Sequence, residues 1–168
     1  DPEAPSTPKM LLDDTLARCE RLRTNHPTAA PVIEPLVEPL REAFAKLDPF
    51  EAAPVHGDMA AGQFLWTGER LVLLDLDMYG YTDPAYDAGH FMGQLTRRCL
   101  LDSTLPAHSA QWVDGFRAAY LEAMPRVSPR NMVFYQGMTL IRKIYTLCRV
   151  RPTEGPAIVP PLGRAAMT

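Results

Sequence analysis

Apolar side chains recur every three or four residues along two neighbouring stretches at the beginning of the chain. The first stretch covers residues 9–23, and the repeat stops at Asn25-His26-Pro27. The second covers residues 31–47 and stops before Asp48-Pro49. Such a repeat places the apolar side chains on one face of an α-helix. The two stretches therefore predict a helical hairpin over residues 9–48, with apolar positions at Leu12, Leu16, Cys19, Leu22, Ile33, Leu36, Val37, Leu40, Phe44 and Leu47.

The apolar runs become short between residues 54 and 77. Pro54-Val55 leads into His56-Gly57-Asp58, and two short apolar runs follow at residues 64–66 and 71–74. Thr67-Gly68-Glu69 separates these runs and has the composition of a turn. Short apolar runs on either side of a glycine-containing turn are typical of a β-hairpin. We therefore expect one small β-hairpin among helices.

The helical repeat returns in the second half of the chain. Pro84 is well placed in the first turn of a helix that runs to about Arg98. Two further helices are predicted over residues 111–123 and 129–150. Residues 1–8 have the composition of a linker, and residues 152–168 form a proline-rich tail that we expect to be irregular. The predicted fold is mainly α with a small β-hairpin, in one domain over residues 9–151.

Composition and charge narrow the classes of function. The chain has 168 residues, 46% of them hydrophobic and 22% charged, which is typical of one globular domain or one lobe of a larger enzyme. The net charge is -3 without any block of like charges, so we expect no nucleic-acid partner. The sequence contains no apolar run of membrane-spanning length and no signal peptide, so we expect a cytoplasmic protein without a membrane partner. The cysteines Cys19, Cys99 and Cys148 have no metal or redox spacing and are expected to be reduced thiols.

The candidate chemistry is concentrated between His56 and Asp87. Asp58 is followed five residues later by Gln63, and the second apolar run of the hairpin leads into Asp75. Phosphoryl transfer needs a carboxylate that orients or accepts the proton of the attacking hydroxyl, and hard oxygen ligands for Mg²⁺. An aspartate, an amide and a second aspartate in this order supply both. The spacing from aspartate to amide equals that of the protein-kinase catalytic loop, H-R-D-x-x-x-x-N.

The segments HGDMAAGQFLW and LVLLDLDMYGYTDPAYDAG resemble the aminoglycoside phosphotransferase and choline kinase-like family. Its motifs run roughly H-G-D-x-x-x-x-N, then I-D-F/W, then G-D-P-x-x-D. The resemblance implies that Asp58 is the catalytic base and that Gln63 and Asp75 bind Mg²⁺ and, through it, ATP. It also implies that His56 and Asp87 support the catalytic loop. Gln63 replaces the usual asparagine, and its extra methylene moves the amide outward by about 1.5 Å.

The resemblance also implies a particular part of the fold. The flanking helices resemble the C-terminal lobe of a protein-kinase-like α+β fold. The family's N-terminal lobe supplies a glycine-rich loop and a strand lysine for the nucleotide, but Lys9, Lys46 and Lys143 are the only lysines and none has a strand-like context. We therefore expect that the N-terminal lobe is absent from this chain, that it or a partner chain completes the site, and that the 168 residues alone are inactive.

Three functions remain open from the sequence. The first is an ATP-dependent phosphotransferase whose acceptor is a hydroxyl of an aminoglycoside-, sugar- or choline-like small molecule. The second is a peptide Ser/Thr kinase of the same fold, because the motif describes the phosphate side of the reaction and not the acceptor. The third is a pseudokinase or binding module without activity.

Several other polar residues have more than one interpretation. His56 and Asp58, joined by His90 or His108, would make a metallohydrolase site, although no H-x-H or H-E-x-x-H spacing supports it. Asp77 is a minor candidate for a second metal ligand. Other residues are candidates either for a substrate pocket or for ordinary surface and packing positions, namely Arg142, Lys143, Tyr79, Tyr81 and Tyr86.

Overall fold

The computed structural model describes residues 7–151 and 155–167, and its first two helices form the predicted hairpin. Helix α1 is Pro8–Asn25 and helix α2 is Ala30–Ala45, with a short 3-10 turn, Pro27–Ala29, between them. Helix α1 begins where the Thr7 hydroxyl accepts a hydrogen bond from the Met10 amide at 3.2 Å. The expected linker, residues 1–8, lies largely outside the described residues, and Pro8 already belongs to α1.

Two antiparallel strand pairs follow the helical hairpin. Strands β2, Phe64–Trp66, and β3, Leu71–Leu73, form the predicted β-hairpin. A second pair joins β1, Ala53–Val55, to β4, Gly80–Thr82, and was not predicted. The expectation of a single hairpin is therefore incomplete. Pairing of β1 with β4 closes the loop that contains the candidate site residues, because it brings the two ends of residues 53–82 together.

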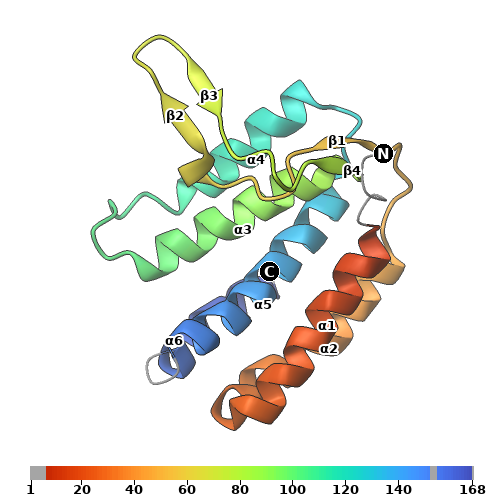
Figure 1. The fold of residues 1–168 in the computed structure, drawn as a ribbon, viewed down its shortest axis with the longest axis vertical. Coiled ribbons are helices and arrows are strands. Elements are labelled where there is room, and N and C mark those ends of the chain that lie inside the picture. Colours follow the sequence, from red (N-terminus) through yellow and green to blue (C-terminus); the bar gives the residue numbers. More distant parts are fainter. Residues whose placement is uncertain (1–6, 152–154, 168) are drawn as a thin grey trace.

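Helix α5, Pro129–Val150, lies at the centre of the molecule. It packs against α3, Ala85–Leu101, on one side and against α1 and α2 on another (Figure 1). Helix α4, Gln111–Ala123, packs on α3, and the β2–β3 hairpin projects beyond the helices (Figure 1). The foot of that hairpin is anchored by Phe64, whose ring contacts Phe91 of α3 edge-on with 6.0 Å between the centroids. The central helix contributes the largest share of the buried core, including Met132, Tyr135, Met138, Leu140, Ile141 and Ile144.

The expectation of an irregular tail over residues 152–168 is wrong for the part that the structure describes. Helix α6, Gly155–Ala166, packs on α5 and α2 despite two internal prolines, Pro160 and Pro161. Val159 and Leu162 are completely buried. Burial of two large aliphatic side chains stabilises by about 1.5–3 kcal/mol each, which offsets part of the cost of about 3 kcal/mol for each proline in a helix. Proline content alone did not reveal this tertiary contact.

Two glycines allow α3 and α5 to approach each other closely. A β-carbon on Gly89 would lie 2.5 Å from both the Met132 carbonyl oxygen and the Tyr135 β-carbon. One on Gly93 would lie 2.8 Å from the Thr139 side chain. Neither distance leaves room for a methyl group without a shift of the backbone. The four-residue spacing puts both glycines on the same face of α3, so this face determines how near α5 can lie.

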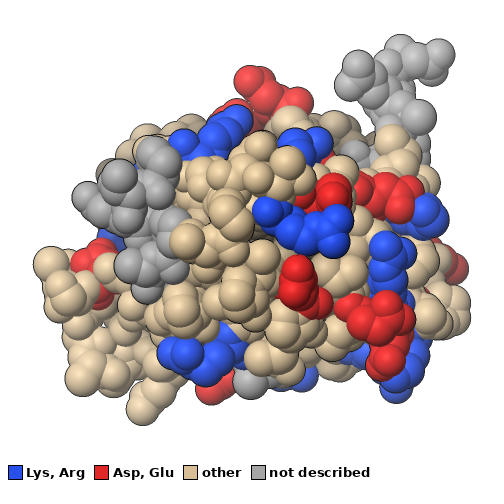
Figure 2. Space-filling model, turned by 90° about the horizontal axis from the view of Figure 1, so that it is seen from below, with Lys and Arg blue, Asp and Glu red and all other residues tan. Residues whose placement is uncertain are grey.

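The surface of the described residues carries charges of both signs. In Figure 2, acidic and basic side chains alternate with uncharged ones across the face that is seen, without a broad area of one sign. Among the described residues, none of the helices combines the length and the apolar character needed to cross a membrane.

We predict opposite effects for two Gly→Ala changes in helices. Gly89→Ala should lower the free energy of unfolding by about 1–3 kcal/mol, because the new methyl group meets the α5 backbone. Gly115→Ala in α4 should raise it by about 0.5–1 kcal/mol, because a β-carbon there meets no atom within 4 Å and alanine is the better helix former. Urea denaturation of both variants measures the difference. Equal stabilities would show that α3 and α5 are not in close contact at Gly89.

Candidate active site

The loop that carries the candidate base is tied to the beginning of α3. The carboxylate of Asp87 accepts a hydrogen bond from the His56 amide at 2.6 Å and another from the Gly57 amide at 3.0 Å. Asp87 lies in the first turn of α3, where a negative charge is also favoured by the helix dipole. One side chain thus fixes two consecutive peptide groups immediately before Asp58.

Gly57 is required by the geometry of this loop. Its φ is +85°, a left-handed conformation that side chains rarely adopt. A β-carbon there would lie 2.1 Å from the carbonyl oxygen of Met78, in the loop before β4. The glycine of the His-Gly-Asp motif therefore allows the residue 56–58 loop to lie directly against the residue 77–80 loop.

His56 joins the same loop to the end of strand β3. Its ring is buried, and Nε2 donates to the carbonyl oxygen of Leu74 at 2.8 Å, since a carbonyl only accepts. Nδ1 accepts a hydrogen bond from the Asp58 amide at 3.3 Å. A neutral ring with its proton on Nε2 satisfies both contacts. His56 therefore links the backbone of Asp58 to the residue that precedes Asp75, without presenting a free nitrogen for direct chemistry.

The carboxylate of Asp58 is held by a histidine that the sequence motif does not include. Nε2 of His90, in α3, lies 2.9 Å from Oδ1 of Asp58, and Nδ1 lies 3.1 Å from the hydroxyl of Thr139 in α5. The hydrogen bond from His90 holds the pKa of Asp58 below its usual range, and the nearby Lys143 ammonium lowers it further. His90 lies three residues after Asp87, on the same face of α3. That spacing is the sequence signal that could have identified it.

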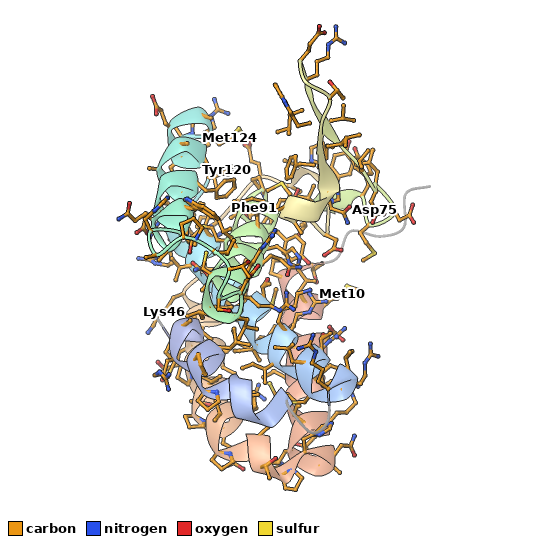
Figure 3. All side chains as sticks on the ribbon, turned by 90° about the vertical axis from the view of Figure 1, so that its left-hand side faces the viewer. Met10, Lys46, Asp75, Phe91, Tyr120 and Met124 are labelled. Atoms are coloured by element: carbon orange, nitrogen blue, oxygen red, sulfur yellow. The ribbon has the colours of Figure 1, made fainter. Side chains whose placement is uncertain are left out.

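The two candidate metal ligands lie next to each other at the foot of the hairpin. Nε2 of Gln63 donates to a carboxylate oxygen of Asp75 at 2.9 Å. The backbone of Asp75 has a φ of 62°, which is rare outside glycine and is tolerated best by Asp and Asn. Figure 3 shows Asp75 at the base of the projecting hairpin. The turn in the backbone directs the Asp75 side chain towards Gln63.

This donor set fits Mg²⁺. One carboxylate and one amide oxygen are hard ligands, and Mg²⁺ commonly takes only one or two protein groups, with water and substrate phosphates completing its octahedron. No cluster of three His, Cys, Asp or Glu side chains in residues 7–151 and 155–167 is placed to hold a metal. The metallohydrolase alternative lacks such a cluster, and His108 contacts Trp112 at the beginning of α4 instead.

The Asp-Pro-x-x-Asp segment begins α3 with a buried network. Asp83 is almost fully buried and accepts hydrogen bonds from the Ala85 amide at 2.9 Å and from Nδ2 of Asn131 at 2.7 Å. Burial raises the pKa of Asp83, and these two hydrogen bonds oppose that effect. Asn131 is in the first turn of α5 and also binds the backbone of Asp48. The network therefore fixes the beginning of α3 to α5, and with it Asp87 and His90.

Asp58 opens onto a cavity of about 370 Å³ between α1, α5 and the loop that precedes β4. Gln63 and Asp75 do not line it. The cavity is lined by Tyr79, Tyr81 and Tyr86, which the sequence left as either pocket or packing residues. Arg142 and Lys143 line it as well. The structure therefore separates two regions, with the Gln63–Asp75 pair at the hairpin and a cavity on the other side of Asp58. The polar side chains that line the cavity are Asp58, His90, Asp77, Arg18, Arg142, Lys143, Thr82, Thr139, Thr146, Tyr79, Tyr81 and Tyr86.

We predict that His90→Ala raises the pKa of Asp58. The hydrogen bond from His90 favours the ionised carboxylate, so its removal moves the pKa upward towards the ordinary value of 3.8, and the carboxylate takes up its proton at a higher pH. Titration of the Asp58 side-chain carbon by NMR measures this change.

Asp102 provides the internal control for this titration. Its pKa is also lowered, but by hydrogen bonds from Thr104, and it should therefore stay unchanged in the His90→Ala protein. An Asp58 curve identical in both proteins would contradict the hydrogen bond seen here.

Comparison with known proteins agrees with this geometry. The model of the family described as phosphotransferase enzyme family matches residues 2–130, which is more than half of the chain. Neither the curated proteins nor the solved structures give a match. The matched range includes the whole segment from His56 to Asp87 and the helical hairpin before it, and it confirms the resemblance drawn from the motifs. The chain belongs to the phosphotransferase enzyme family.

Proposed function

We propose that the protein transfers the γ-phosphoryl group of ATP to a hydroxyl group of a small molecule. The observation that carries this proposal is the position of Asp58, whose carboxylate is hydrogen-bonded by His90 and faces a cavity. A cavity of about 370 Å³ is of the size that holds a small molecule, which favours such an acceptor over a peptide. Membership of the phosphotransferase enzyme family supports the reaction class.

In this proposal Asp58 orients the acceptor hydroxyl and takes its proton. The hydroxyl oxygen then forms a bond to the γ-phosphorus through its lone pair. The bond from that phosphorus to the bridging oxygen breaks, and its electron pair remains on ADP. The low pKa of Asp58 keeps the carboxylate ionised and able to accept a hydrogen bond from the hydroxyl before transfer. Asp87 and His56 hold the backbone on which Asp58 depends.

Gln63 and Asp75 would hold Mg²⁺ on the nucleotide side of Asp58. The ion would neutralise charge on the transferring phosphates, which is the main electrostatic requirement of phosphoryl transfer. Asp75 brings a negative charge and Gln63 a neutral oxygen, and their side chains are already in contact. Asp75 is exposed and Gln63 is partly exposed, which leaves room for water and phosphate oxygens.

We further propose that this chain forms the C-terminal lobe of a protein-kinase-like fold and that a second lobe covers the hairpin. Exposed apolar side chains support the proposal, since Trp66 is 63% exposed and Leu71 62% exposed. Leu65, Leu76 and Met78 are more than half exposed as well. Apolar side chains gathered in this way mark a surface that another protein segment covers. That lobe, from the same polypeptide or a partner, would supply the phosphate-binding loop and lysine.

We predict that Asp58→Asn lowers turnover by about 10²–10⁴-fold, because the amide cannot accept the hydroxyl proton. The assay follows ADP release in the enzyme with its nucleotide-covering lobe present. Thermal melting should be almost unchanged, since asparagine keeps the shape of the side chain. Asp114→Asn, at an exposed position in α4, removes the same charge and should leave turnover intact. Full activity of Asp58→Asn would exclude Asp58 as the base.

We also predict that Asp75→Ala abolishes the Mg²⁺-dependent part of ATP binding, and that Gln63→Asn keeps some of it. Asp75 provides the charged ligand, whereas asparagine still offers an amide oxygen on a shorter side chain. Calorimetry with and without Mg²⁺ measures both variants, again with the covering lobe present. Asp114→Ala is the matched control, because it removes an exposed aspartate on α4 that lies outside both the hairpin and the cavity. Unchanged Mg-ATP affinity in Asp75→Ala would exclude this site.

A further inference from the structure

The cavity beside Asp58 is lined by three basic side chains. Arg18 comes from α1, and Arg142 and Lys143 come from α5. The cavity also contains two carboxylates, Asp58 and the exposed Asp77. A mildly acidic chain with a net charge of -3 thus has a cavity in which cations outnumber carboxylates.

The two arginines share a single carboxylate. Nε of Arg18 donates to Oδ2 of Asp14 at 2.7 Å, and Nη2 of Arg142 lies 3.6 Å from the same oxygen. Nη1 of Arg142 also reaches the hydroxyl of Tyr86, at 3.5 Å. Both arginine side chains are only about a quarter exposed, at 27% for Arg18 and 23% for Arg142. Arg18 and Arg142 therefore carry two positive charges opposite the single negative charge of Asp14.

Lys143 makes no direct polar contact with another side chain among the described residues. No hydrogen bond or ion pair of its ammonium group is formed there, although burial lowers its pKa and Arg97, Arg142 and Arg18 lower it further by repulsion. The negative charge of Asp58 acts in the opposite direction and raises the pKa of Lys143. A half-buried ammonium beside like charges is unfavourable for folding alone. An anion in the cavity would supply the missing partner.

The location of these cations separates them from the nucleotide side. Gln63 and Asp75, the proposed metal ligands, lie outside the cavity, whereas Lys143 and Arg142 lie within it. A positive wall that served the ATP phosphates would be expected to include the metal ligands. These cations instead lie on the side of Asp58 where the acceptor would bind.

We propose that this cavity binds a small hydroxylated acceptor that carries a carboxylate or phosphate group. Its anionic group would bind Lys143 and Arg142, and its hydroxyl would point to Asp58; this assignment rests on the proposed function, which makes Asp58 the base. Tyr79, Tyr81 and Tyr86 would contact the carbon skeleton, as their rings line the same cavity. A polycationic or choline-like acceptor does not match this lining, because Lys143 would repel it.

Binding of small anionic probes to the 168-residue chain tests this proposal without an activity assay. The probes are glycerol 3-phosphate and glycerate, which carry an anionic group and a hydroxyl, with glycerol and choline as the neutral and cationic counterparts. Ligand-detected NMR should show binding of one or both anions and no binding of glycerol or choline. The phosphate and carboxylate probes distinguish the two anionic groups. Equal binding of all four probes, or preference for choline, would overturn the proposal.

Variants of Lys143 then test the residue itself. Lys143→Gln should weaken anion binding by about tenfold to a hundredfold, and Lys143→Arg should retain most of it, because a charged hydrogen bond is lost only in the first. Circular dichroism should show an unchanged fold, since Lys143 has no hydrogen bond or ion pair in the described residues to lose. Arg126→Gln removes an exposed charge outside the cavity and should change nothing. Unchanged affinity in Lys143→Gln would refute the assignment.

The two proposals fail separately. If Asp58→Asn remains fully active while the anionic probes bind through Lys143, the proposed reaction is wrong and the anion site stands. If Asp58→Asn is inactive while Lys143→Gln binds the probes normally, the reaction stands and the acceptor class is wrong.

Discussion

The close approach of α3 to α5 at Gly89 and Gly93 is the contact on which the candidate site depends. It brings Nδ1 of His90 within 3.1 Å of the Thr139 hydroxyl. That contact orients the imidazole ring, and Nε2 is then placed to hydrogen-bond Asp58. One turn earlier, Asp87 reaches the backbone of the residue 56–58 loop. Lys143 lies one turn beyond Thr139 on the partner helix. A wider separation of the two helices would move all of these groups at once.

The loops around Asp58 are held mainly by side chains that bind backbone groups. Asp87 binds two amides, His56 binds a carbonyl and an amide, and Asp83 binds the amide that begins α3. The β1–β4 pair closes the segment, but it has only three residues in each strand. Irregular backbone can therefore hold Asp58 in place because the amides of residues 56, 57 and 58 each donate to a specific side chain.

Local patterns predicted helices α1 to α5 and the β2–β3 hairpin because these elements depend on periodicity within a short window. The motif also predicted that Gln63 and Asp75 lie close together, and their side chains are hydrogen-bonded in the structure. Three features depend on contacts between distant segments and were missed. The β1–β4 pair joins residues more than twenty positions apart, α6 is stabilised by burial against other helices, and the cationic wall combines α1 with α5. His90 is intermediate, since its spacing from Asp87 was visible but its contact with Asp58 was not.

The hydrogen bond between Gln63 and Asp75 would make the proposed metal binding an exchange reaction. The amide now presents its N–H to the carboxylate, so a cation that uses both side-chain oxygens must displace that N–H and turn the amide round. Affinity for such an ion would be lowered by the strength of the hydrogen bond that it replaces. In the proposed site the glutamine would therefore act as an internal competitor for the carboxylate that the ion needs.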